Sequence, residues 1–416
     1  MKNTVVIGGG IIGLCTAYYL HKSGHRVRVI DAGDMTGGAS FVNAGYVAPS
    51  HFVPLAAPGM VSKGLRYMLD SSSPFYMKPR FESDFIKWSY AFFKSCTSKN
   101  VAKASRPIFE INMRSRALYQ DLLNDEDWDS QFDARGLMMY FQTEKLGYHE
   151  IDLAHRARKE FGIQTEVLEP HEIKERFEPD MDLDIKGGVW YPCDRQMTPG
   201  DFMKTMIKYL EKQGVELYRN QQVQDFVIKE DQVKEIKTKT GVFSCDQTVI
   251  CAGTWSPQLA KNLGRTLLVE AGKGYRLDVK VPTGIRQPAI LVERNMAISP
   301  MEGYTRFAGT MELAGINDKI NPSRVKALKE GAEAFYTNLN ISQKVLEQAH
   351  YGLRPVSPDG LPMIGKDDRI SNVYWGTGHA MMGWSLGPAT GKILQELIDG
   401  ESSGMDLEVF HPNRKY

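Results

Sequence analysis

Glycines near the start of the chain carry the first motif with chemical potential. Gly8, Gly10 and Gly13 have the spacing G-x-G-x-x-G, between an apolar run and a helix-like stretch that begins at Ile11. A second apolar run ends at Asp31, 18 residues after Gly13. In a strand–turn–helix–strand unit, the glycines permit a tight turn, a close approach to pyrophosphate and close helix packing, while the acid binds a ribose hydroxyl. The motif therefore predicts a dinucleotide site.

Two other interpretations of this segment are weaker. A turn of this kind can bind nothing, and Lys2 followed by the apolar stretch 5–20 loosely resembles a secretory signal. Four glycines interrupt that stretch and no small-residue cleavage site follows it. Because the flanking strands, the glycine order and the terminal acid agree, dinucleotide binding is favoured. The glycines alone do not separate NAD from FAD.

Composition limits the remaining possibilities. The chain has 416 residues, 42% hydrophobic and 24% charged, with a net charge of +1. This length favours two domains. Near-neutral net charge gives no field that attracts nucleic acid or an anionic membrane. The sequence has no uninterrupted apolar run of about 18 residues, so no membrane span is expected. Five scattered cysteines without a C-x-x-C pair predict neither a disulfide framework nor a metal site, and fit a reducing compartment.

Periodicity predicts interleaved helices and strands with no single linker. Thr198 is an expected N-cap, with Pro199 at the first helical position. Helices are expected at 11–23, 81–125, 149–161, 199–213, 323–338 and 383–399, and strands at 4–7, 27–30, 137–141, 216–218, 223–228, 233–238, 248–251, 266–281, 289–293, 304–310 and 372–375. Such alternation predicts a nucleotide domain assembled from separated segments, with the other domain inserted between them.

Three later stretches distinguish FAD from NAD. In GGASFVNAG (37–45), glycines and a compact turn form a loop whose backbone can lie flat against a second ring. In TVICAGTWS (248–256), an apolar strand ends in small residues that let backbone amides reach a ligand. GTGHAMMGW (376–384) is another glycine turn between a strand and a helix. Such turns are where α/β folds bind ligands.

Together these stretches resemble the amino-acid-oxidising flavoproteins that include D-amino acid oxidase, glycine oxidase and sarcosine oxidase. The run NAGYVAPSHFVPLAAPGMVSKGLRYMLDSSSPFYMKP (43–79) is similar, more narrowly, to bacterial D-amino acid dehydrogenases. GKGYR (272–276) and the stretch 352–399 extend the resemblance over nearly the whole chain.

The resemblance implies an α/β (α+β overall) fold with two domains. A Rossmann-like FAD-binding domain would comprise residues 1–50, 192–265 and 345–416. A substrate domain, built on a mainly antiparallel sheet with helices, would comprise residues 51–191 and 266–344. Some relatives attach the flavin through a C-terminal cysteine, but this chain has none after Cys251. We therefore expect non-covalent FAD.

The resemblance also assigns cofactor contacts residue by residue. The glycine turn would bind pyrophosphate, Asp31 the ribose, the loop from Ser40 the flavin, and Val223 the adenine edge. The full set is Gly8, Gly10, Ile11, Ile12, Gly13, Asp31, Ala32, Ser40, Asn43, Ala44, Gly45, Val223, Ala252, Gly253, Trp255, Gly378, His379, Met382 and Gly383.

The expected C-terminal helix adds an electrostatic role. A reduced flavin gathers negative charge at its pyrimidine end, and a helix N-terminus at Gly383 would stabilise that charge by roughly 0.3–2 kcal/mol. The alternative is that Gly376, Gly378 and Gly383 only turn the chain.

Arg354, in YGLRPVSPDGLPMIG, is the expected substrate anchor. A guanidinium binds a carboxylate bidentately and stays charged when buried, and relatives place their carboxylate-binding arginine in this G-L-R-P stretch. The alternative is a structural arginine paired with Asp359 or another acid. Tyr275 is an expected second contact, and Arg276 ranks lower because strand alternation places it on the opposite face.

Other pocket candidates are less specific. His379 can touch substrate, tune the flavin or simply pack, because its ordinary pKa near 6.5 permits each role. His51 and Tyr46, in the loop that resembles the family, are weaker candidates.

The implied reaction is oxidative deamination of a D-amino acid to a 2-oxo acid and ammonia, by hydride transfer from Cα to flavin N5. Alternatives are oxidation of D-proline or hydroxyproline, or of glycine- or sarcosine-type amines. An NAD-dependent dehydrogenase and a non-enzymatic flavin-binding protein are less favoured. The electron acceptor would be a quinone, another electron-transfer component or oxygen. We expect a cytoplasmic protein, and peripheral contact with the inner face of the membrane stays open.

Overall fold

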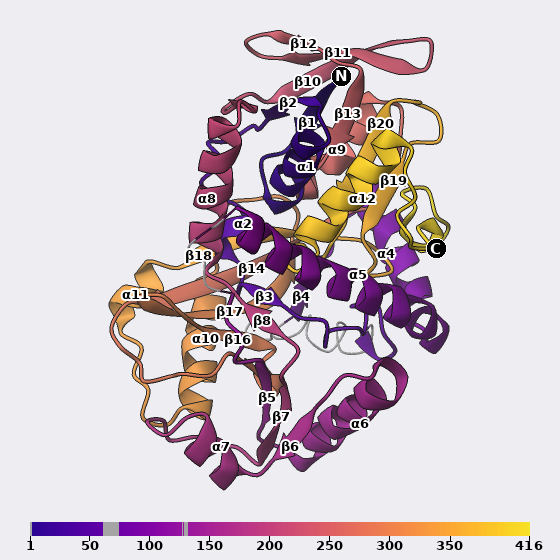
Figure 1. Ribbon diagram of the computed structural model, residues 1–416. Coiled ribbons are helices and arrows are strands. Elements are labelled where there is room, and N and C mark those ends of the chain that lie inside the picture. Colours follow the sequence, from indigo (N-terminus) through magenta and orange to yellow (C-terminus); the bar gives the residue numbers. More distant parts are fainter. Residues whose placement is uncertain (1, 61–74, 127, 129–131) are drawn as a thin grey trace.

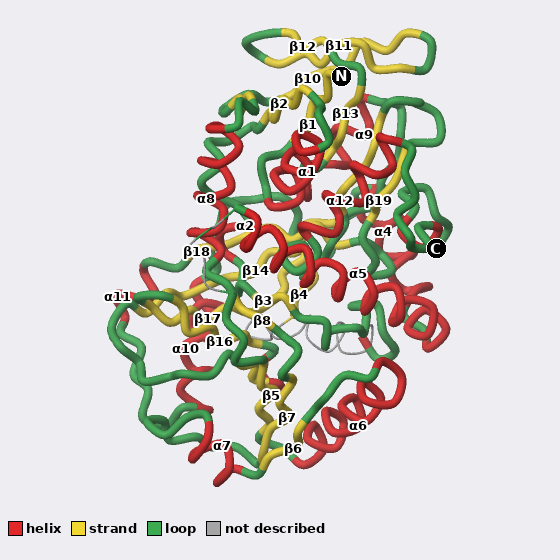
Figure 2. The backbone as a smooth tube through the Cα atoms, in the orientation of Figure 1, coloured by secondary structure: helices red, strands yellow, loops and turns green. Residues whose placement is uncertain are grey.

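The computed structural model describes residues 2–60, 75–126, 128 and 132–416. Two large β-sheets form its frame, one in the upper and one in the lower half of Figure 1. A small antiparallel sheet of β10 (Val223–Lys229), β11 (Gln232–Thr238) and β12 (Val242–Ser244) lies beyond the upper sheet, near the N-terminus (Figure 2). Residues 61–74 of the family-like run lie outside the described residues.

The upper sheet is mainly parallel, as the strand–turn–helix–strand motif at the start of the chain predicts. Its order is β19-β20-β13-β1-β2-β9, and every pair is parallel except β19–β20. The strands are β1 (Asn3–Ile7), β2 (Arg26–Ile30), β9 (Glu216–Tyr218), β13 (Gln247–Ile250), β19 (Met363–Lys366) and β20 (Val373–Thr377). Segments more than 340 residues apart in the sequence therefore meet in one sheet.

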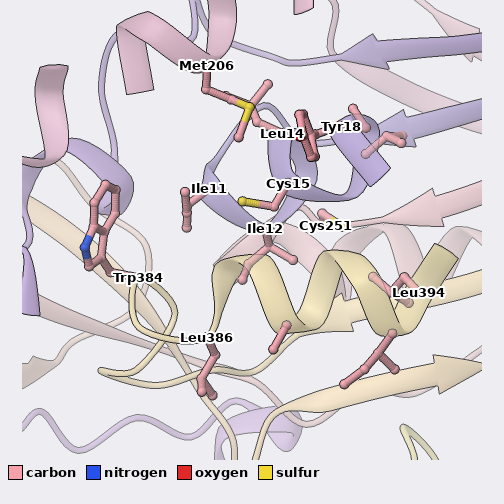
Figure 3. Close-up of a cluster of buried hydrophobic side chains, with 14 of the residues drawn as sticks. Ile11, Ile12, Leu14, Cys15, Tyr18, Met206, Cys251, Trp384, Leu386 and Leu394 are labelled. Carbon is pink, nitrogen blue, oxygen red and sulfur yellow. The ribbon is translucent and has the colours of Figure 1, made fainter. Parts of the chain in front are cut away.

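One core joins this sheet to its helices. Helix α1 (Ile11–Lys22) packs against α12 (Gly387–Asp399), α8 (Pro199–Lys212) and the long helix α5 (Ser98–Asp125). A Cβ at Gly391 would approach the backbone of Cys15 closer than 3.0 Å, so glycine permits α12 to lie tightly on α1. Figure 3 shows part of this cluster, with Ile11, Ile12, Leu14, Cys15, Tyr18, Met206, Cys251, Trp384, Leu386 and Leu394 labelled.

The lower, nine-stranded sheet has the path β18-β14-β17-β16-β15-β5-β7-β6, and β4 pairs with β17. All pairs are antiparallel except β15–β5 and β17–β4. Its strands are β4 (Phe75–Met77), β5 (Leu137–Phe141), β6 (Glu166–Leu168), β7 (Gly187–Tyr191), β14 (Glu270–Val279), β15 (Ala289–Leu291), β16 (Met296–Met301), β17 (Tyr304–Leu313) and β18 (His350–Val356). Helix α10 (Pro322–Phe335) packs on one face.

The remaining described elements are mostly short. They are α2 (Ala39–Val42), β3 (Tyr46–Val47), α4 (Ser83–Ser95), α6 (Glu144–Phe161), α7 (Pro170–Arg176), β8 (Arg195–Gln196), α9 (Ser256–Asn262), α11 (Gln343–Glu347) and the 3-10 turns Gly253–Trp255, Val292–Arg294 and Glu408–Phe410.

The predicted mixed α/β fold is confirmed, and most expected elements are present. Several boundaries were wrong, among them one end each of three helices. Helix α6 begins at Glu144 rather than 149, and α10 ends at Phe335 rather than 338. Helix α12 begins at Gly387 rather than Gly383, because separate turns occupy the preceding residues: Met382 N–H donates to His379 O (2.8 Å) and Gly387 N–H to Trp384 O (3.3 Å).

The division into two domains stays a prediction. Two elements cross its expected boundaries. Helix α5, expected in the substrate domain, shares a core with α1 and α12. Strand β18, expected in the FAD-binding domain, pairs with β14 in the nine-stranded sheet.

Candidate functional site

The glycine turn after β1 is too crowded for side chains at two of its positions. Gly8 has φ +111°, and a Cβ there would overlap the carbonyl of Cys251, in the turn that follows β13. A Cβ at Gly13 would overlap the carbonyl of Gly8 itself. These contacts bring the start of α1 close to the strand ends, which leaves the helix N-terminus facing the edge where ligands bind.

The predicted ribose acid reaches this same turn. Asp31 Oδ2 accepts from Gly9 N–H (2.6 Å) and Oδ1 from Gly33 N–H (2.7 Å). No side chain caps α1 at Gly10, and Ile11 N–H donates to Ser40 Oγ (2.9 Å). The amides of a helix's first turn have no acceptor within the helix, and together with the positive end of the helix dipole they are suited to a pyrophosphate. Ser40 therefore lies beside the N-terminus of α1.

The loop that contains Ser40 is held by the nine-stranded sheet. Arg276 Nη1 donates to Phe41 O (2.8 Å), and Arg306 Nη1 donates to Phe41 O (3.0 Å) and Asn43 O (2.7 Å). The Asn43 side chain closes the turn, accepting from Gly45 N–H (2.8 Å). Ala44 O accepts from Ser299 Oγ (2.8 Å). Two arginines and a serine of the lower sheet thus fix the backbone of the expected flavin loop.

The second and third predicted stretches meet in space. Thr377 Oγ1, at the end of β20, donates to Gly253 O (3.0 Å) and accepts from Ser256 Oγ (3.0 Å). Gly253 has φ +55°. A Cβ at this residue would have no atom within 4 Å, so the position where its side chain would lie is open space. Beside it Ala252 is half-buried and Trp255 is exposed. Val223 lies in the core under the small sheet.

His379 follows β20 and is fully buried. Its Nε2 lies 3.0 Å from Thr390 Oγ1 of α12. Burial lowers the pKa of His379 to about 3, so the ring is neutral near pH 7. The next residue, Ala380, donates its N–H to Pro355 O of β18 (2.7 Å). The turn continues through Met382 and Gly383, which are both half-buried. A Cβ at Gly383 would be in contact with the side chain of His379.

The described residues fit FAD. Three buried polar atoms in the second and third stretches have no hydrogen-bond partner among the described residues: Thr254 Oγ1, His379 Nδ1 and Trp384 Nε1. Gly38, in the first stretch, faces open space as Gly253 does. The second and third stretches thus meet at a place with open backbone and unused polar groups, and the first stretch lies against the N-terminus of α1. That is the arrangement a large, flat, polar-edged ring requires.

Arg354, the expected carboxylate anchor, lies on β18 opposite Gly272 of β14. Its Nη1 donates to Thr310 O (2.7 Å), and no acidic side chain of the described residues pairs with it. Burial without a counter-charge lowers its pKa to about 10. The guanidinium is half-buried, and a partly desolvated charge without a counter-charge is suited to binding an anion.

The alternative partner of Arg354 is already occupied. Both carboxylate oxygens of Asp359 accept from Arg414, at 2.7 Å each. This buried, bidentate pair ties the C-terminal segment to the loop after β18. The sequence alternative in which Asp359 neutralises Arg354 is therefore wrong.

The structure separates Tyr275 from Arg354. Register places Arg354, Gly274 and Arg276 on the face of the sheet that meets the flavin loop, whereas Tyr275 points to the opposite face. The Tyr275 hydroxyl donates to Glu312 Oε2 (2.9 Å) beneath α10. The expected alternation is confirmed: Arg276 lies on the face of Arg354 and holds Phe41, while Tyr275 lies on the other face.

The weaker candidates have structural partners. Tyr46 OH donates to Ile298 O (2.5 Å) and lies 3.0 Å from Ala289 O. Ser50 Oγ bridges His51 Nδ1 (3.2 Å) to Asp194 Oδ2 (2.5 Å). Burial lowers the pKa of His51, opposed by the nearby Asp194. These contacts hold the loop after β3 in place.

Two features of the anchor were not foreseen. Thr310 adopts φ +63° where β17 bulges against β14, and the bulge presents its carbonyl to Arg354. The guanidinium then lies over Gly274, where a Cβ would overlap it. The small residues of GKGYR were a signal for this close approach, but nothing local marks Thr310.

Across the described residues, no group of three or more His, Cys, Asp or Glu side chains is arranged to hold a metal ion. Within the same residues, no helix is both long and apolar enough to cross a membrane.

Comparison with known proteins gives consistent results. The sequence model of the family described as FAD dependent oxidoreductase matches residues 3–397. The D-amino acid dehydrogenase of Vibrio vulnificus (strain YJ016) is 29% identical over 415 residues, covering 97% of this chain and 98% of that protein. That of Granulibacter bethesdensis is 28% identical over 411 residues, covering 97% of each.

A solved structure shares the fold. Glycine oxidase from Geobacillus kaustophilus aligns with a TM-score of 0.79 at 21% identity, covering 100% of this chain and 99% of that one.

Proposed function

Since the chain belongs to the FAD dependent oxidoreductase family, we propose that this FAD-dependent oxidoreductase deaminates a D-amino acid to a 2-oxo acid and ammonia. The observation that carries the proposal is Arg354: a half-buried guanidinium with no acidic partner among the described residues, on a strand bonded to the His379–Ala380 turn. Full-length relatives named D-amino acid dehydrogenase support the D-configuration.

The cofactor contacts are proposed for the three converging stretches and the glycine turn. Gly8, Gly10, Gly13 and the first-turn amides of Ile11 and Ile12 would hold the pyrophosphate. Asp31 and Ala32 would hold the ribose, and Val223 the adenine edge. The residues proposed around the flavin are Ser40, Asn43, Ala44, Gly45, Ala252, Gly253, Trp255, Gly378, His379, Met382 and Gly383. When bound, FAD would supply the two-electron acceptor for the hydride that leaves the substrate Cα.

The chain's own contribution is mainly positioning. Arg354 binds the substrate carboxylate through two parallel N–H···O bonds, which fixes the direction of the Cα–H bond. The substrate amine must be unprotonated, because its lone pair forms the C=N bond as hydride leaves Cα. Water then hydrolyses the free imine. His379 is neutral, so it can donate or accept one hydrogen bond without adding charge.

The setting of the reaction follows from the same proposal. Electrons pass to a quinone, to another electron-transfer component or to oxygen. To identify the acceptor, the rate at which reduced flavin is reoxidised is measured with each of these three acceptors. We place the protein in the cytoplasm with access to the inner face of the membrane. Five free cysteines, all within the described residues, fit a reducing compartment.

Anaerobic flavin reduction tests the function. Purified yellow protein is mixed with D- and L-amino acids, glycine, sarcosine, D-proline and hydroxyproline isomers, and the visible absorbance is followed. We expect bleaching by D-amino acids and none by their L-enantiomers. Bleaching by L-amino acids alone, or by none of the panel, would overturn the proposal. Faster reduction by D-proline or sarcosine would assign the substrate to secondary amines.

A further inference from the structure

Helix α4 (Ser83–Ser95) carries an exposed apolar face that the described chain does not cover. Ile86, Tyr90 and Phe93 are 52%, 65% and 61% exposed, at the i, i+4 and i+7 spacing of one helix face. Phe81, just before the helix, is 97% exposed. Thirteen large hydrophobic residues are exposed in the described part of the chain, and these four fall within 13 positions. Clustering of this kind marks an interaction surface.

The charge around this face is mainly positive. From residue 78 to residue 103 the chain has six basic and two acidic residues, a local charge of +4 in a chain whose net charge is +1. Asp84 is paired with Lys261 (2.5 Å), and Glu82 with Arg80, which also pairs with Glu270. Lys87 and Lys94 are exposed on the helix itself, and Lys94 Nζ lies 5.7 Å from the ring centre of Tyr90. The aromatic face is thus rimmed by ammonium groups.

The buried face of the same helix forms part of the wall behind the candidate site. Trp88 Nε1 donates to Val356 O (2.8 Å), two residues along β18 from Arg354. Trp88 and Phe92 pack with Val356 and Ala380, the residue after His379. Helix α4 lies at the side of the molecule near the C-terminus (Figure 1), and Lys94 Nζ contacts Tyr416 O (3.0 Å). One helix diameter, about 10–12 Å, separates the exposed face from the site wall.

We propose that the exposed face of α4 is a membrane-docking surface that binds anionic phospholipid. Aromatic and aliphatic side chains on one face of a helix, with lysines at the rim, match an interface in which rings enter the headgroup region and ammonium groups meet lipid phosphates. A second copy of this chain would bring the same lysines together across a two-fold contact, so charge favours the lipid. Docking here places the candidate site beside the bilayer, where a lipid-dissolved electron acceptor is concentrated.

Vesicle co-sedimentation tests the surface with the full-length, FAD-loaded protein. The vesicles are phosphatidylcholine alone, or an equal mixture of phosphatidylcholine and phosphatidylglycerol, at low salt and in 0.5 M NaCl. We expect at least tenfold stronger binding to the anionic vesicles, reduced by salt. The triple variant Ile86→Ser/Tyr90→Ser/Phe93→Ser should lose at least tenfold in binding, and Lys87→Gln/Lys94→Gln should lose the preference for anionic lipid.

A matched control separates the surface from general hydrophobicity. Tyr148, on α6, is 70% exposed, and Tyr148→Ser should bind vesicles as the unaltered protein does. Visible absorbance and the turnover of soluble dyes report whether each variant is folded. Because binding is measured without substrate, loss of the proposed enzymatic activity would leave this result intact.

Two outcomes overturn the docking proposal. The first is the absence of vesicle binding: the unaltered protein stays in the supernatant with anionic vesicles. Equal binding of the triple variant and the unaltered protein to anionic vesicles would contradict the proposal in the same way. The other is a dimer in sedimentation velocity that becomes a monomer in the triple variant without any vesicle binding, which would assign the face to a second copy.

Discussion

The guanidinium of Arg354 occupies the space in which a side chain at Gly274 would lie. A Cβ at this glycine would come closer than 3.0 Å to Cζ and to both terminal nitrogens of the arginine. Gly274 pairs with Gly352 and Arg354 with Gly272, so the antiparallel register of β14 and β18 creates this contact. The orientation of the proposed substrate anchor therefore depends on a residue without a side chain.

Gly274→Ala should weaken substrate binding while the protein keeps its FAD. The added methyl group overpacks this site at a cost of about 1–3 kcal/mol. We expect Arg354 or the strand to shift in order to relieve the overlap. We expect the substrate concentration for half-maximal anaerobic flavin reduction to rise about tenfold to a hundredfold. Gly241→Ala is the matched control, since a Cβ there meets nothing within 4 Å. An unchanged half-saturation in Gly274→Ala would contradict the role given to this contact.

Arg354→Leu should separate function from stability. Loss of the anchor should weaken apparent substrate affinity by roughly 2–5 kcal/mol. Removing a half-buried charge that lacks a counter-ion should leave the free energy of unfolding unchanged or raise it by up to about 4 kcal/mol. Urea denaturation of the substrate-free protein measures the second effect. Arg414→Leu, which breaks a buried pair, should instead be destabilising; a similar loss of stability in both variants would argue against an unpaired Arg354.

Asp359→Asn should reduce stability without changing substrate affinity. Arg414, which is buried against Asp359, would lose its counter-charge, and breaking such a pair costs about 3–5 kcal/mol. Thermal or urea unfolding reports this loss, and anaerobic titration of the folded fraction reports affinity. If the variant bound substrate much more weakly or tightly, Asp359 would have to interact with Arg354 after all.

His379 should make stability depend on pH. Burial lowers its pKa in the folded protein to about 3, against about 6.5 when unfolded. The unfolded state binds the extra proton between these values, so this contribution is fully present above pH 6.5 and is lost as the pH falls toward 3. The slope is about 1.4 kcal/mol per pH unit below pH 6.

The variant His379→Gln isolates that contribution. Urea unfolding at pH 5.0 and 7.5 should show a smaller difference in the free energy of unfolding for the variant than for the unaltered protein. Equal differences in the two proteins would mean that His379 titrates normally in the folded state.

The sequence alone determined the nucleotide-binding unit and the three stretches around the expected ring. These depend on local rules: a β-branched run before glycines, an apolar helix after them, and an acid at the end of the next strand. Gly8 and Gly13 proved to be in contacts that exclude a side chain, as their positions in the motif required. Asp31 reaches the turn because the parallel register of β1 and β2 follows from the same short unit.

Only the tertiary structure decided which charges pair and which face of the sheet meets the site. Asp359 finds Arg414, which is 55 positions away, and leaves Arg354 without an acid among the described residues. Tyr275 was expected beside the anchor and Arg276 was ranked lower, until the register of β14 between β17 and β18 placed Arg276 on the face of Arg354 and Tyr275 on the other. Such choices depend on contacts between segments distant in sequence, and local periodicity carries no information about them.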